Sequence, residues 1–110
     1  MTEYDYWKIF PRMPRKVTLG DITVRDGFQH LEKFISTRAK IFYAEEMIFA
    51  GCKNIEVTNL GNAFLMPQFS DAEKVLAHLR SDRFRERCAK KRINIDDVCI
   101  TAVTIREPGV

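Results

Sequence analysis

Runs of β-branched and apolar residues alternate along this chain with segments that carry helical spacing, and this order constrains the fold most strongly. Residues 17–24, 54–58 and 98–105 are rich in Val, Ile and Thr, which predicts three strands. The third run is apolar at nearly every position, as in strands that are covered on both faces. Alternating strands and helices are typical of α/β proteins with parallel strands, so we predict the order β-α-β-α-β.

The segments between the strands show the start and stop signals of helices. Ser36 or Thr37 can cap a first helix, and Gly51 is its predicted stop. Residues 70–73 (Ser-Asp-Ala-Glu) have the form of a capping box, in which the Ser and Glu side chains satisfy exposed amides at the start of a second helix. The charged segment 81–92 is predicted to form a further helix.

Length and composition exclude several classes of protein. The chain has 110 residues, a length that fits one globular domain. Its formal net charge of +3 is too small to imply nucleic-acid binding by itself. Its apolar runs are a few residues long, whereas a membrane-spanning helix needs about 20. The three cysteines form no CxxC motif, and the N-terminus lacks the basic start and apolar stretch of a secretory signal. Reduced thiols in the cytoplasm are the simplest interpretation.

The first 16 residues differ from the rest of the chain. They combine several aromatic and basic residues with two closely spaced prolines, a pattern that disfavours a helix. We predict an N-terminal arm over residues 1–16, followed by one domain over residues 17–110. The aromatic residues of this arm, which we expect to pack on the domain or on a partner, are Tyr4, Tyr6, Trp7 and Phe10.

Polar residues gather where the first two predicted strands end. The first strand is followed by Arg25, Asp26 and Gln29, and the second contains Glu56 and ends next to Asn59. Because working residues of α/β folds lie at the carboxyl ends of parallel strands, we expect these side chains at one rim. The Asp26 carboxylate suits Mg²⁺ or Mn²⁺, and the planar, permanently charged fork of Arg25 suits a carbonyl that becomes an enolate. A structural ion pair is the competing interpretation of this Arg-Asp pair.

The segment that begins at Arg25 resembles a known signature. Arg25-Asp26-Gly27-Phe28-Gln29 is similar to the Arg-Asp-Gly-x-Gln motif of the metal-dependent TIM-barrel lyase and synthase superfamily. Further blocks at matching spacing, across residues 17–80, resemble its hydroxymethylglutaryl-CoA lyase branch, which is grouped with pyruvate carboxyltransferase domains. These blocks are Ser36-Thr37, Lys40, Ala50-Gly51, Ile55 to Thr58, Pro67-Gln68, Asp71 to Glu73 and Val75-Leu76.

The resemblance implies the N-terminal β-α-β-α-β portion of a (β/α)8 TIM barrel with parallel strands, that is, an incomplete barrel. It also implies a divalent-metal-dependent lyase that cleaves a carbon–carbon bond of an acyl-CoA, hydroxy-acid or keto-acid through an enolate. Asp26 would then ligate Mg²⁺ or Mn²⁺, and Arg25 would bind substrate and stabilise the enolate. Glu56 would act beside Arg25 in the catalytic network, while Gln29 and Asn59 would contact substrate. The complete enzyme is expected to be a cytoplasmic homo-oligomer.

Two features set this chain apart from that family. The loop after the second strand is Asn-Leu-Gly-Asn-Ala-Phe over residues 59–64, where the lyase branch usually has Ser-Phe-Val-Ser-Pro-Lys, so one pocket wall is rebuilt. The chain also lacks the His-x-His metal pair and the Gly-rich Cys loop, which the resemblance places in the second half of a barrel of about 250 residues. We therefore expect an N-terminal piece that is inactive alone and needs the remaining barrel or a partner chain.

Two other functions compete with this one. Residues 83–92 form a basic stretch that could contact phosphates of CoA or of nucleic acid, although interleaved acidic residues favour a solvated helix face and make nucleic acid the weaker choice. Apolar parallel strands with open edges would instead suit a non-catalytic half-barrel that docks onto a partner or onto itself.

Overall fold

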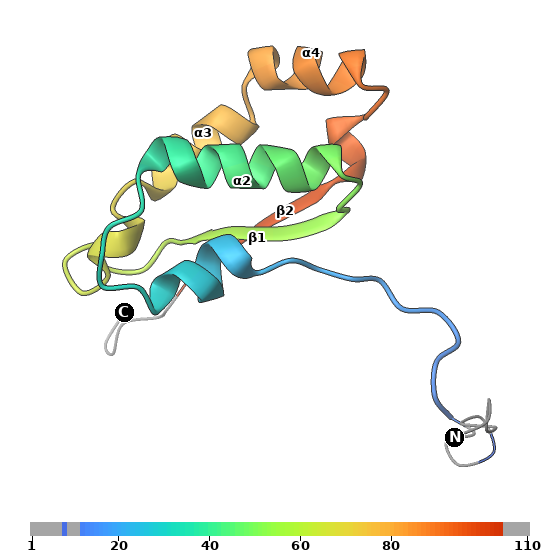
Figure 1. The fold of residues 1–110 in the computed structure, drawn as a ribbon, viewed down its shortest axis with the longest axis horizontal. Helices are drawn as coiled ribbons and strands as arrows, with labels where there is room; N and C mark the ends of the chain where they lie inside the picture. Colours follow the sequence, from blue (N-terminus) through green and yellow to red (C-terminus); the bar gives the residue numbers. More distant parts are fainter. Residues whose placement is uncertain (1–7, 9–11, 105–110) are drawn as a thin grey trace.

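The computed structural model describes residue 8 and residues 12–104, and it has a mixed α/β architecture (Figure 1). Its elements, in chain order, are η1 (Thr23–Gly27), α2 (Thr37–Phe49), β1 (Asn54–Asn59), η2 (Pro67–Phe69), α3 (Ala72–Leu79), α4 (Asp82–Lys90), η3 (Ile95–Asp97) and β2 (Cys99–Val103). The strands β1 and β2 form a two-stranded parallel sheet. The predicted α/β class with parallel strands is therefore confirmed for these two strands.

The sheet is covered by helices on one side. The helices α2, α3 and α4 lie on one side of β1, and η1 lies on the other (Figure 1). Successive side chains of a strand point to opposite faces, so Ile55 and Val57 face the helices while Glu56 faces the η1 side. The pairing of β1 with β2 is regular from Asn54 to Glu56 and slips between Glu56 and Thr58.

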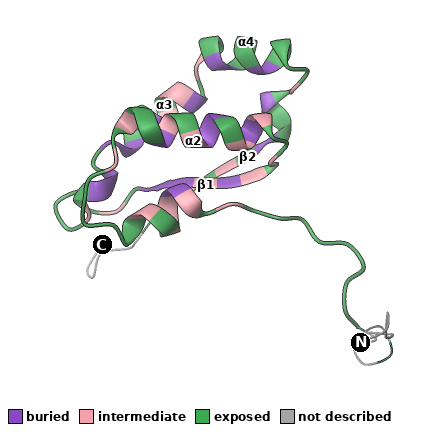
Figure 2. Ribbon diagram, in the orientation of Figure 1, coloured by how far each residue is buried: buried purple, intermediate pink, exposed green. Residues whose placement is uncertain are grey.

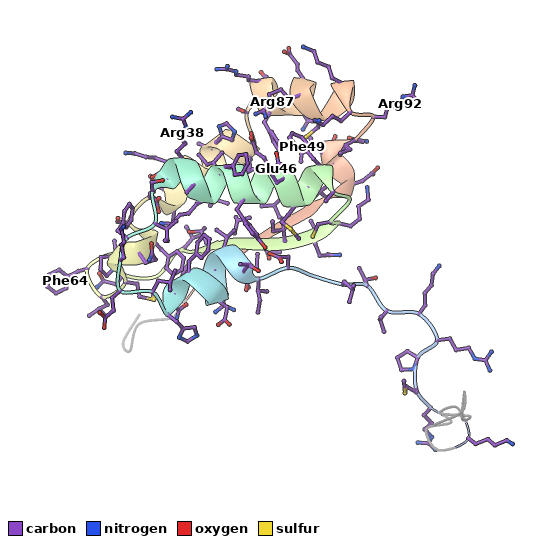
Figure 3. All side chains as sticks on the ribbon, viewed as in Figure 1. Arg38, Glu46, Phe49, Phe64, Arg87 and Arg92 are labelled. Atoms are coloured by element: carbon purple, nitrogen blue, oxygen red, sulfur yellow. The ribbon has the colours of Figure 1, made fainter. Side chains whose placement is uncertain are left out.

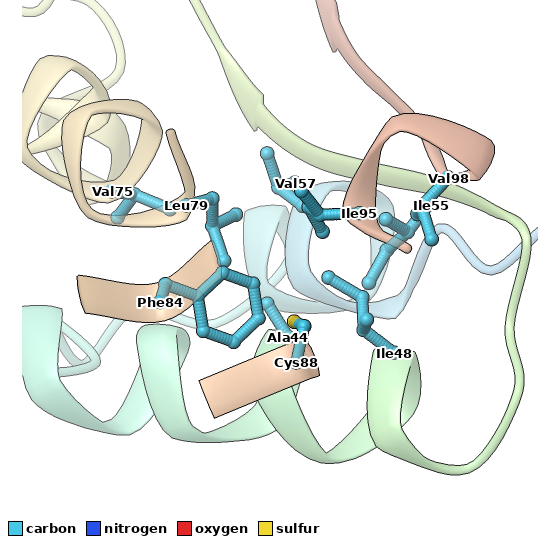
Figure 4. Close-up of a cluster of buried hydrophobic side chains, with 10 residues drawn as sticks. All are labelled: Ala44, Ile48, Ile55, Val57, Val75, Leu79, Phe84, Cys88, Ile95 and Val98. Atoms are coloured by element: carbon cyan, nitrogen blue, oxygen red, sulfur yellow. The ribbon is translucent and has the colours of Figure 1, made fainter. Parts of the chain in front are cut away.

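The hydrophobic core lies between the sheet and the three helices (Figure 4). It is a continuous cluster made of Ala44, Ile48, Ile55, Val57, Val75, Leu79, Phe84, Cys88, Ile95 and Val98. Phe84 is fully buried and its ring packs 5.7 Å from the ring of Phe49, measured between centroids. Each buried aliphatic or aromatic side chain of this size contributes about 1.5–3 kcal/mol of transfer free energy. The core therefore fixes the helices against one face of the sheet and leaves the other face to η1.

Serine hydroxyls cap α2 and α4, and the start and stop signals predicted for α2 are confirmed. The Ser36 hydroxyl accepts a hydrogen bond from the Ala39 amide at 3.1 Å, which caps α2. The helix ends at Phe49, and Gly51 has a φ of 102°, a left-handed conformation that favours glycine. The Ser81 hydroxyl likewise accepts from the Phe84 amide at 3.2 Å and caps α4.

The predicted capping box at the start of α3 is wrong. Ser70 ends η2, and the N-cap of α3 is Asp71, whose side chain makes no capping hydrogen bond. The Asp71 carboxylate instead accepts hydrogen bonds from Lys40 Nζ at 2.9 Å and from the Thr37 hydroxyl at 2.7 Å. Those two contacts lie in the protein interior, and they draw the Asp71 side chain away from the helix terminus.

The predicted first strand over residues 17–24 is also wrong in extent. Only Asp21 pairs with β1, through hydrogen bonds from its amide to the Asn54 carbonyl and from the Glu56 amide to its own carbonyl, both at 2.9 Å. The Asp21 carboxylate accepts from the Thr23 amide and hydroxyl at 3.1 Å, and this local turn starts η1. The preceding residues Val17 and Leu19 are exposed. A strand at the edge of a small sheet lacks the second neighbour that would hold its β-branched residues extended.

The last strand is not covered on both faces. Cys99 and Thr101 are exposed, and Ile100, Ala102 and Val103 are only partly buried. β2 is the outer strand of the two-stranded sheet, and among the described residues no further strand pairs with its outer edge. The prediction that this strand is covered on both faces is therefore wrong for the described residues. Its side chains are mostly apolar, but its position at the edge of the sheet leaves them partly exposed.

The N-terminal arm is described only in part. Residues 12–16 are exposed, and Figure 2 shows this segment in the colour of exposed residues as it leads toward the N-terminus. The aromatic residues at positions 4, 6, 7 and 10 lie outside the described residues, so their predicted packing and the division at residue 16 stay predictions. Within the described part, no helix has the length and apolarity that crossing a bilayer demands.

Candidate functional site

Arg25 and Glu56 form the central contact of the candidate site. Arg25 donates from Nε to Oε2 of Glu56 at 2.9 Å, and its Nη2 lies 2.8 Å from the same oxygen. The two residues are 31 positions apart in the chain, and both side chains are 19% exposed. A guanidinium held through two nitrogens has a fixed orientation, and its partial exposure leaves it within reach of a ligand.

Local structure explains why these two side chains meet. The bridge at Asp21 ties the incoming chain to β1, and the turn that follows places Arg25 over the strand. Because Ile55 and Val57 face the core, Glu56 lies on the side where η1 packs. The carboxylate and the guanidinium therefore meet on the face of the sheet that the helices leave uncovered.

Asp26 extends the site toward solvent. Its Oδ1 accepts from Nη1 of Arg25 at 3.2 Å, and Nε2 of His30 lies 4.0 Å from the same oxygen. The Asp26 side chain is 47% exposed and that of His30 is 76% exposed. Three of the predicted site residues, Arg25, Asp26 and Glu56, are thus brought together.

The described residues do not fit a metal site by themselves. Their His, Cys, Asp and Glu side chains include no group of three or more that could hold a metal ion. Both nearby carboxylates, Asp26 and Glu56, are engaged by the positive charge of Arg25. A divalent cation such as Mg²⁺ takes about six oxygen ligands. The Asp26 carboxylate, which is 47% exposed and accepts from Arg25 through Oδ1, could supply only part of that set.

Asn59 and Gln29 lie outside this contact network. The buried Asn59 side chain accepts from the Gly61 amide at 2.8 Å, and its Nδ2 lies 3.4 Å from the Met66 sulfur. These bonds close the loop after β1 on itself. Gln29 is exposed and lines a cavity beside Met66 and other loop residues. The predicted roles of both residues in substrate binding stay predictions.

A buried polar cluster that was not predicted from the sequence joins α2 to the loop before α3. The Lys40 side chain is 1% exposed, and its Nζ donates to Asp71 Oδ1 at 2.9 Å and to the Gln68 carbonyl. The ring of Phe34 lies 4.3 Å from Nζ, measured to the ring centroid. The signal was present: Lys40 precedes Ala44 and Ile48 at intervals of four, which places it on the buried face of α2.

A second cluster joins the three helices, and it too was missed. His78 Nε2 and Arg87 Nη1 lie 2.7 Å and 2.5 Å from Glu45 Oε2, so α3 and α4 both contact a carboxylate on α2. Burial would raise the pKa of the Glu45 carboxyl, but the hydrogen bonds from Arg87 and His78 outweigh it and hold that pKa below its usual value. The Arg87 guanidinium also lies 5.6 Å from the ring centroid of Phe49 (Figure 3).

The basic stretch of α4 is on the opposite side of the sheet from Arg25. α4 packs against α3 and η3, whereas η1 lies below β1 in Figure 1. Arg85 pairs with Asp96 through two hydrogen bonds of 3.0 Å and 2.9 Å, and Arg87 pairs with Glu45. These contacts give two of its arginines structural partners.

Comparison with known proteins adds one fold relationship. No protein-family model matches this chain, and no curated protein sequence matches it either. The crystal structure of hydroxymethylglutaryl-CoA lyase from Pseudomonas aeruginosa is similar over 74% of this chain, with a TM-score of 0.58 and 24% sequence identity. The match covers 31% of that lyase chain, so this chain spans about a third of its length. The likeness shows a lyase-like fold and agrees with the barrel portion expected from the sequence.

Proposed function

We propose that this chain forms the N-terminal part of a divalent-metal-dependent carbon–carbon lyase barrel of the hydroxymethylglutaryl-CoA lyase type. Its substrate would be an acyl-CoA or a small hydroxy-acid or keto-acid that is cleaved through an enolate. The proposal is supported by the Arg-Asp-Gly-x-Gln sequence of residues 25–29 and by the fold relationship to a lyase. The observation that carries it is the contact of Arg25 with Glu56, because it orients a permanent cation on the uncovered face of the sheet.

Arg25 is the residue suited to stabilise the enolate oxygen. A guanidinium has five N–H donors, and the contacts to Glu56 and Asp26 engage Nε, Nη1 and Nη2 once each. The remaining two hydrogens are available for a substrate oxygen. A donor that is oriented before the reaction stabilises developing charge without reorganisation, and loss of one such donor typically lowers kcat by about 10²–10³.

Glu56 acts on the chemistry through Arg25. Its carboxylate orients the guanidinium and offsets part of its charge. Replacing Glu56 with Gln would keep one acceptor oxygen while removing the negative charge. The Arg25 fork would then lose its strongest anchor and would populate several orientations.

The proposal assigns one ligand of the divalent metal to this chain. Asp26 would supply one ligand to Mg²⁺ or Mn²⁺, and the other ligands would come from the rest of the barrel or from a partner chain. No step assigned to Arg25 or Glu56 depends on that ion. In a complete barrel we expect a cytoplasmic homo-oligomer, and we expect the 110-residue chain alone not to release acetyl-CoA from hydroxymethylglutaryl-CoA.

The Arg25 assignment can be tested by binding an enolate mimic. Oxalate is a planar dianion that resembles the enolate of a keto-acid, and it can be titrated into the ¹⁵N-labelled chain with Mg²⁺ present. We expect saturable shifts at the Arg25 Nε–H signal and at the Asp26 amide. Arg25→Met should weaken oxalate binding about tenfold or more, because a charge-assisted hydrogen bond is worth about 1.5–3 kcal/mol.

A matched control separates this site from general attraction of an anion to a basic protein. Arg83 is an exposed arginine on α4, on the helical side of the sheet. Arg83→Met should leave oxalate binding unchanged. If oxalate binds equally well to Arg25→Met, or if it shifts signals of α4 instead, the proposed role of Arg25 is wrong.

A non-catalytic half-barrel that docks onto a partner is a second candidate. The observation that favours it is β2, whose outer edge is unpaired within the described part of the chain and whose Cys99 and Thr101 are exposed. Light scattering during size-exclusion chromatography distinguishes the cases. A monomer that binds oxalate supports the lyase reading, whereas a stable dimer that binds none supports the docking module.

A further inference from the structure

A cavity of about 350 Å³ opens between the loop that follows η1 and the loop that precedes α3. Most of its lining is apolar and comes from Leu31, Phe34, Leu65, Met66 and Phe69. Three of these side chains are unusually exposed for their type, namely Leu31 at 45%, Phe34 at 48% and Leu65 at 71%. The cavity therefore has an exposed apolar rim, and covering this rim with an apolar group would be favourable.

The walls of this cavity are held in place by hydrogen bonds. The side-chain oxygen of Gln68 accepts from the backbone amide of Ile35 at 2.8 Å. The side-chain nitrogen of Gln68 donates to the backbone carbonyls of Leu31 and Lys33 at 3.2 Å and 2.9 Å. Beneath it, the buried Lys40 donates to the Gln68 carbonyl and lies against the Phe34 ring. One side chain thus joins both loops, so the cavity is formed before any ligand arrives.

The cavity adjoins the candidate site. Its wall includes Gln29, which follows Arg25 by four positions and Asp26 by three in a continuous helical stretch. Four residues of helix advance the chain by about 5–6 Å. A ligand whose reacting carbonyl lies at Arg25 can therefore reach the apolar cavity past Gln29 through an alkyl chain of several carbons.

The charge of the lining selects the chemical class of the ligand. Glu32 is the one charged side chain among the lining residues that the structure describes. Its carboxylate disfavours an anionic group such as a phosphate, and the apolar rim favours hydrocarbon. The loop over residues 59–66, whose tip Phe64 is 89% exposed and extends away from the fold (Figure 3), supplies Leu65 and Met66 to this rim.

We propose that this cavity is an acyl-group subsite that takes an uncharged aliphatic chain of several carbons attached to the carbonyl that Arg25 binds. The identity of the ligand as an acyl substrate rests on the proposed function, whereas the affinity of the cavity for an alkyl chain does not. The substrate class is thereby narrowed to medium-chain thioesters that carry a β-hydroxyl or β-keto group, which carbon–carbon cleavage through an enolate requires, rather than short dicarboxylic ones.

Neutral thioesters of N-acetylcysteamine can test the proposal with the full 110-residue chain. The acetyl and hexanoyl thioesters are titrated separately into ¹⁵N-labelled protein, and amide shifts are followed. Hexanoyl thioester should shift the amides of Leu31, Phe34 and Leu65. Each added methylene should tighten binding about threefold to fourfold until the cavity is filled.

Variants at the rim provide the specificity control. Leu31→Asn and Leu65→Ser alter exposed side chains and should each weaken hexanoyl binding severalfold, with the rest of the spectrum unchanged. Leu60→Asn is the matched control, because Leu60 is 46% exposed, lies in the same loop as Leu65 and does not line the cavity. It should bind the hexanoyl thioester as the parent does.

Four outcomes would overturn the subsite. They are equal affinity for the acetyl and hexanoyl thioesters, no binding of either, insensitivity to Leu31→Asn and Leu65→Ser, and shifts confined to the separate cavity lined by residues 17–21, 47 and 50–53. Oxalate binding distinguishes this failure from failure of the proposed function. If the chain binds the hexanoyl thioester but not oxalate, only the proposed role of Arg25 is refuted. If it binds oxalate but not the hexanoyl thioester, only the subsite is refuted.

Discussion

Two nitrogens of the Arg25 guanidinium contact the same carboxylate oxygen of Glu56, with Nε at 2.9 Å and Nη2 at 2.8 Å. The contact joins η1 to the middle of β1 across 31 positions of sequence. With the two backbone bonds at Asp21, it holds the segment before α2 against the open face of the sheet. The same contact that orients a candidate catalytic group therefore also fastens the chain locally.

This contact predicts a measurable coupling between the two residues. Arg25→Ala and Glu56→Ala should each lower the free energy of unfolding by about 1–3 kcal/mol, because each leaves a partly buried charge without its partner. The double variant should be less destabilised than the sum, with a coupling free energy of about 1–2 kcal/mol. Urea unfolding followed by circular dichroism measures all four proteins of this cycle.

The exposed pair of Arg85 and Asp96 serves as the comparison for that cycle. Arg85 contacts both Asp96 oxygens, whereas Arg25 contacts one oxygen of Glu56, but the Arg85 and Asp96 side chains are 50% and 67% exposed. Solvent screens such a pair, so its coupling should be clearly smaller. Equal coupling in the two cycles would show that burial does not strengthen the Arg25–Glu56 contact.

Local signals in the sequence predicted much of the fold correctly. Ser36 caps α2 and Gly51 stops it, the charged segment 81–92 contains α4, and β1 spans the predicted residues with Asn59 added. These features depend on interactions within a few residues, which a sequence displays directly. The first strand depends on neighbours on both sides, and the Asp21 turn competes with it, so its β-branched composition was not sufficient.

The candidate site was predictable only in part, for a related reason. Arg25, Asp26 and Glu56 do approach one another. They do so in a different way from the predicted rim, because Arg25 and Asp26 lie on η1 rather than at a strand end and Glu56 lies in the middle of β1. Whether a side chain is free for a ligand depends on contacts that strand order does not reveal. Asn59 illustrates this, because Gly61 follows it two positions later and takes its side-chain oxygen for the loop.

The buried Lys40–Asp71 pair predicts a large and asymmetric response to mutation. Lys40→Met should cost about 3–5 kcal/mol, because it leaves the Asp71 carboxylate buried with only the Thr37 hydroxyl as partner. Replacing both residues, as in Lys40→Met with Asp71→Leu, should restore much of that loss. Urea unfolding gives the values, and limited proteolysis gives the same order if Lys40→Met is too unstable to titrate.

If instead the double variant is less stable than Lys40→Met, the pair contributes net stability beyond satisfying its own buried charges. In that case the hydrogen bond from Thr37 to Asp71 and the contact of Lys40 with Phe34 would carry the difference. Thr37→Val would identify the first of these contributions separately.

The three cysteines should differ in reactivity. Cys99 is exposed, Cys52 is partly buried and Cys88 is fully buried, and burial raises the pKa of the Cys88 thiol. Because the thiolate is the reactive form, iodoacetamide near pH 8 should modify Cys99 first and Cys88 last. Peptide mass spectrometry after timed quenching measures the three rates. Rapid modification of Cys88 in the folded chain would contradict the packing of α4 onto the core.

The contact of Glu45 with His78 and Arg87 predicts a loss of stability in acid. Burial would raise the pKa of Glu45, but the bonds from Arg87 and His78 hold it below its usual value, so the folded state binds this proton less readily than the unfolded state. The contribution of Glu45 to the free energy of unfolding is therefore complete above the pKa of an unfolded glutamate, about 4.3, and disappears as the pH falls through the lower folded value.

Glu45→Gln should lower the free energy of unfolding by about 1–2 kcal/mol at pH 7 and by progressively less below about pH 4. Unfolding by urea at several pH values measures the difference, with Glu46→Gln as the exposed control on the same helix. The free energies of unfolding of Glu45→Gln and the parent could instead differ by the same amount down to pH 3. This result would mean that the Glu45 carboxylate does not hold α3 and α4 to α2 through its charge.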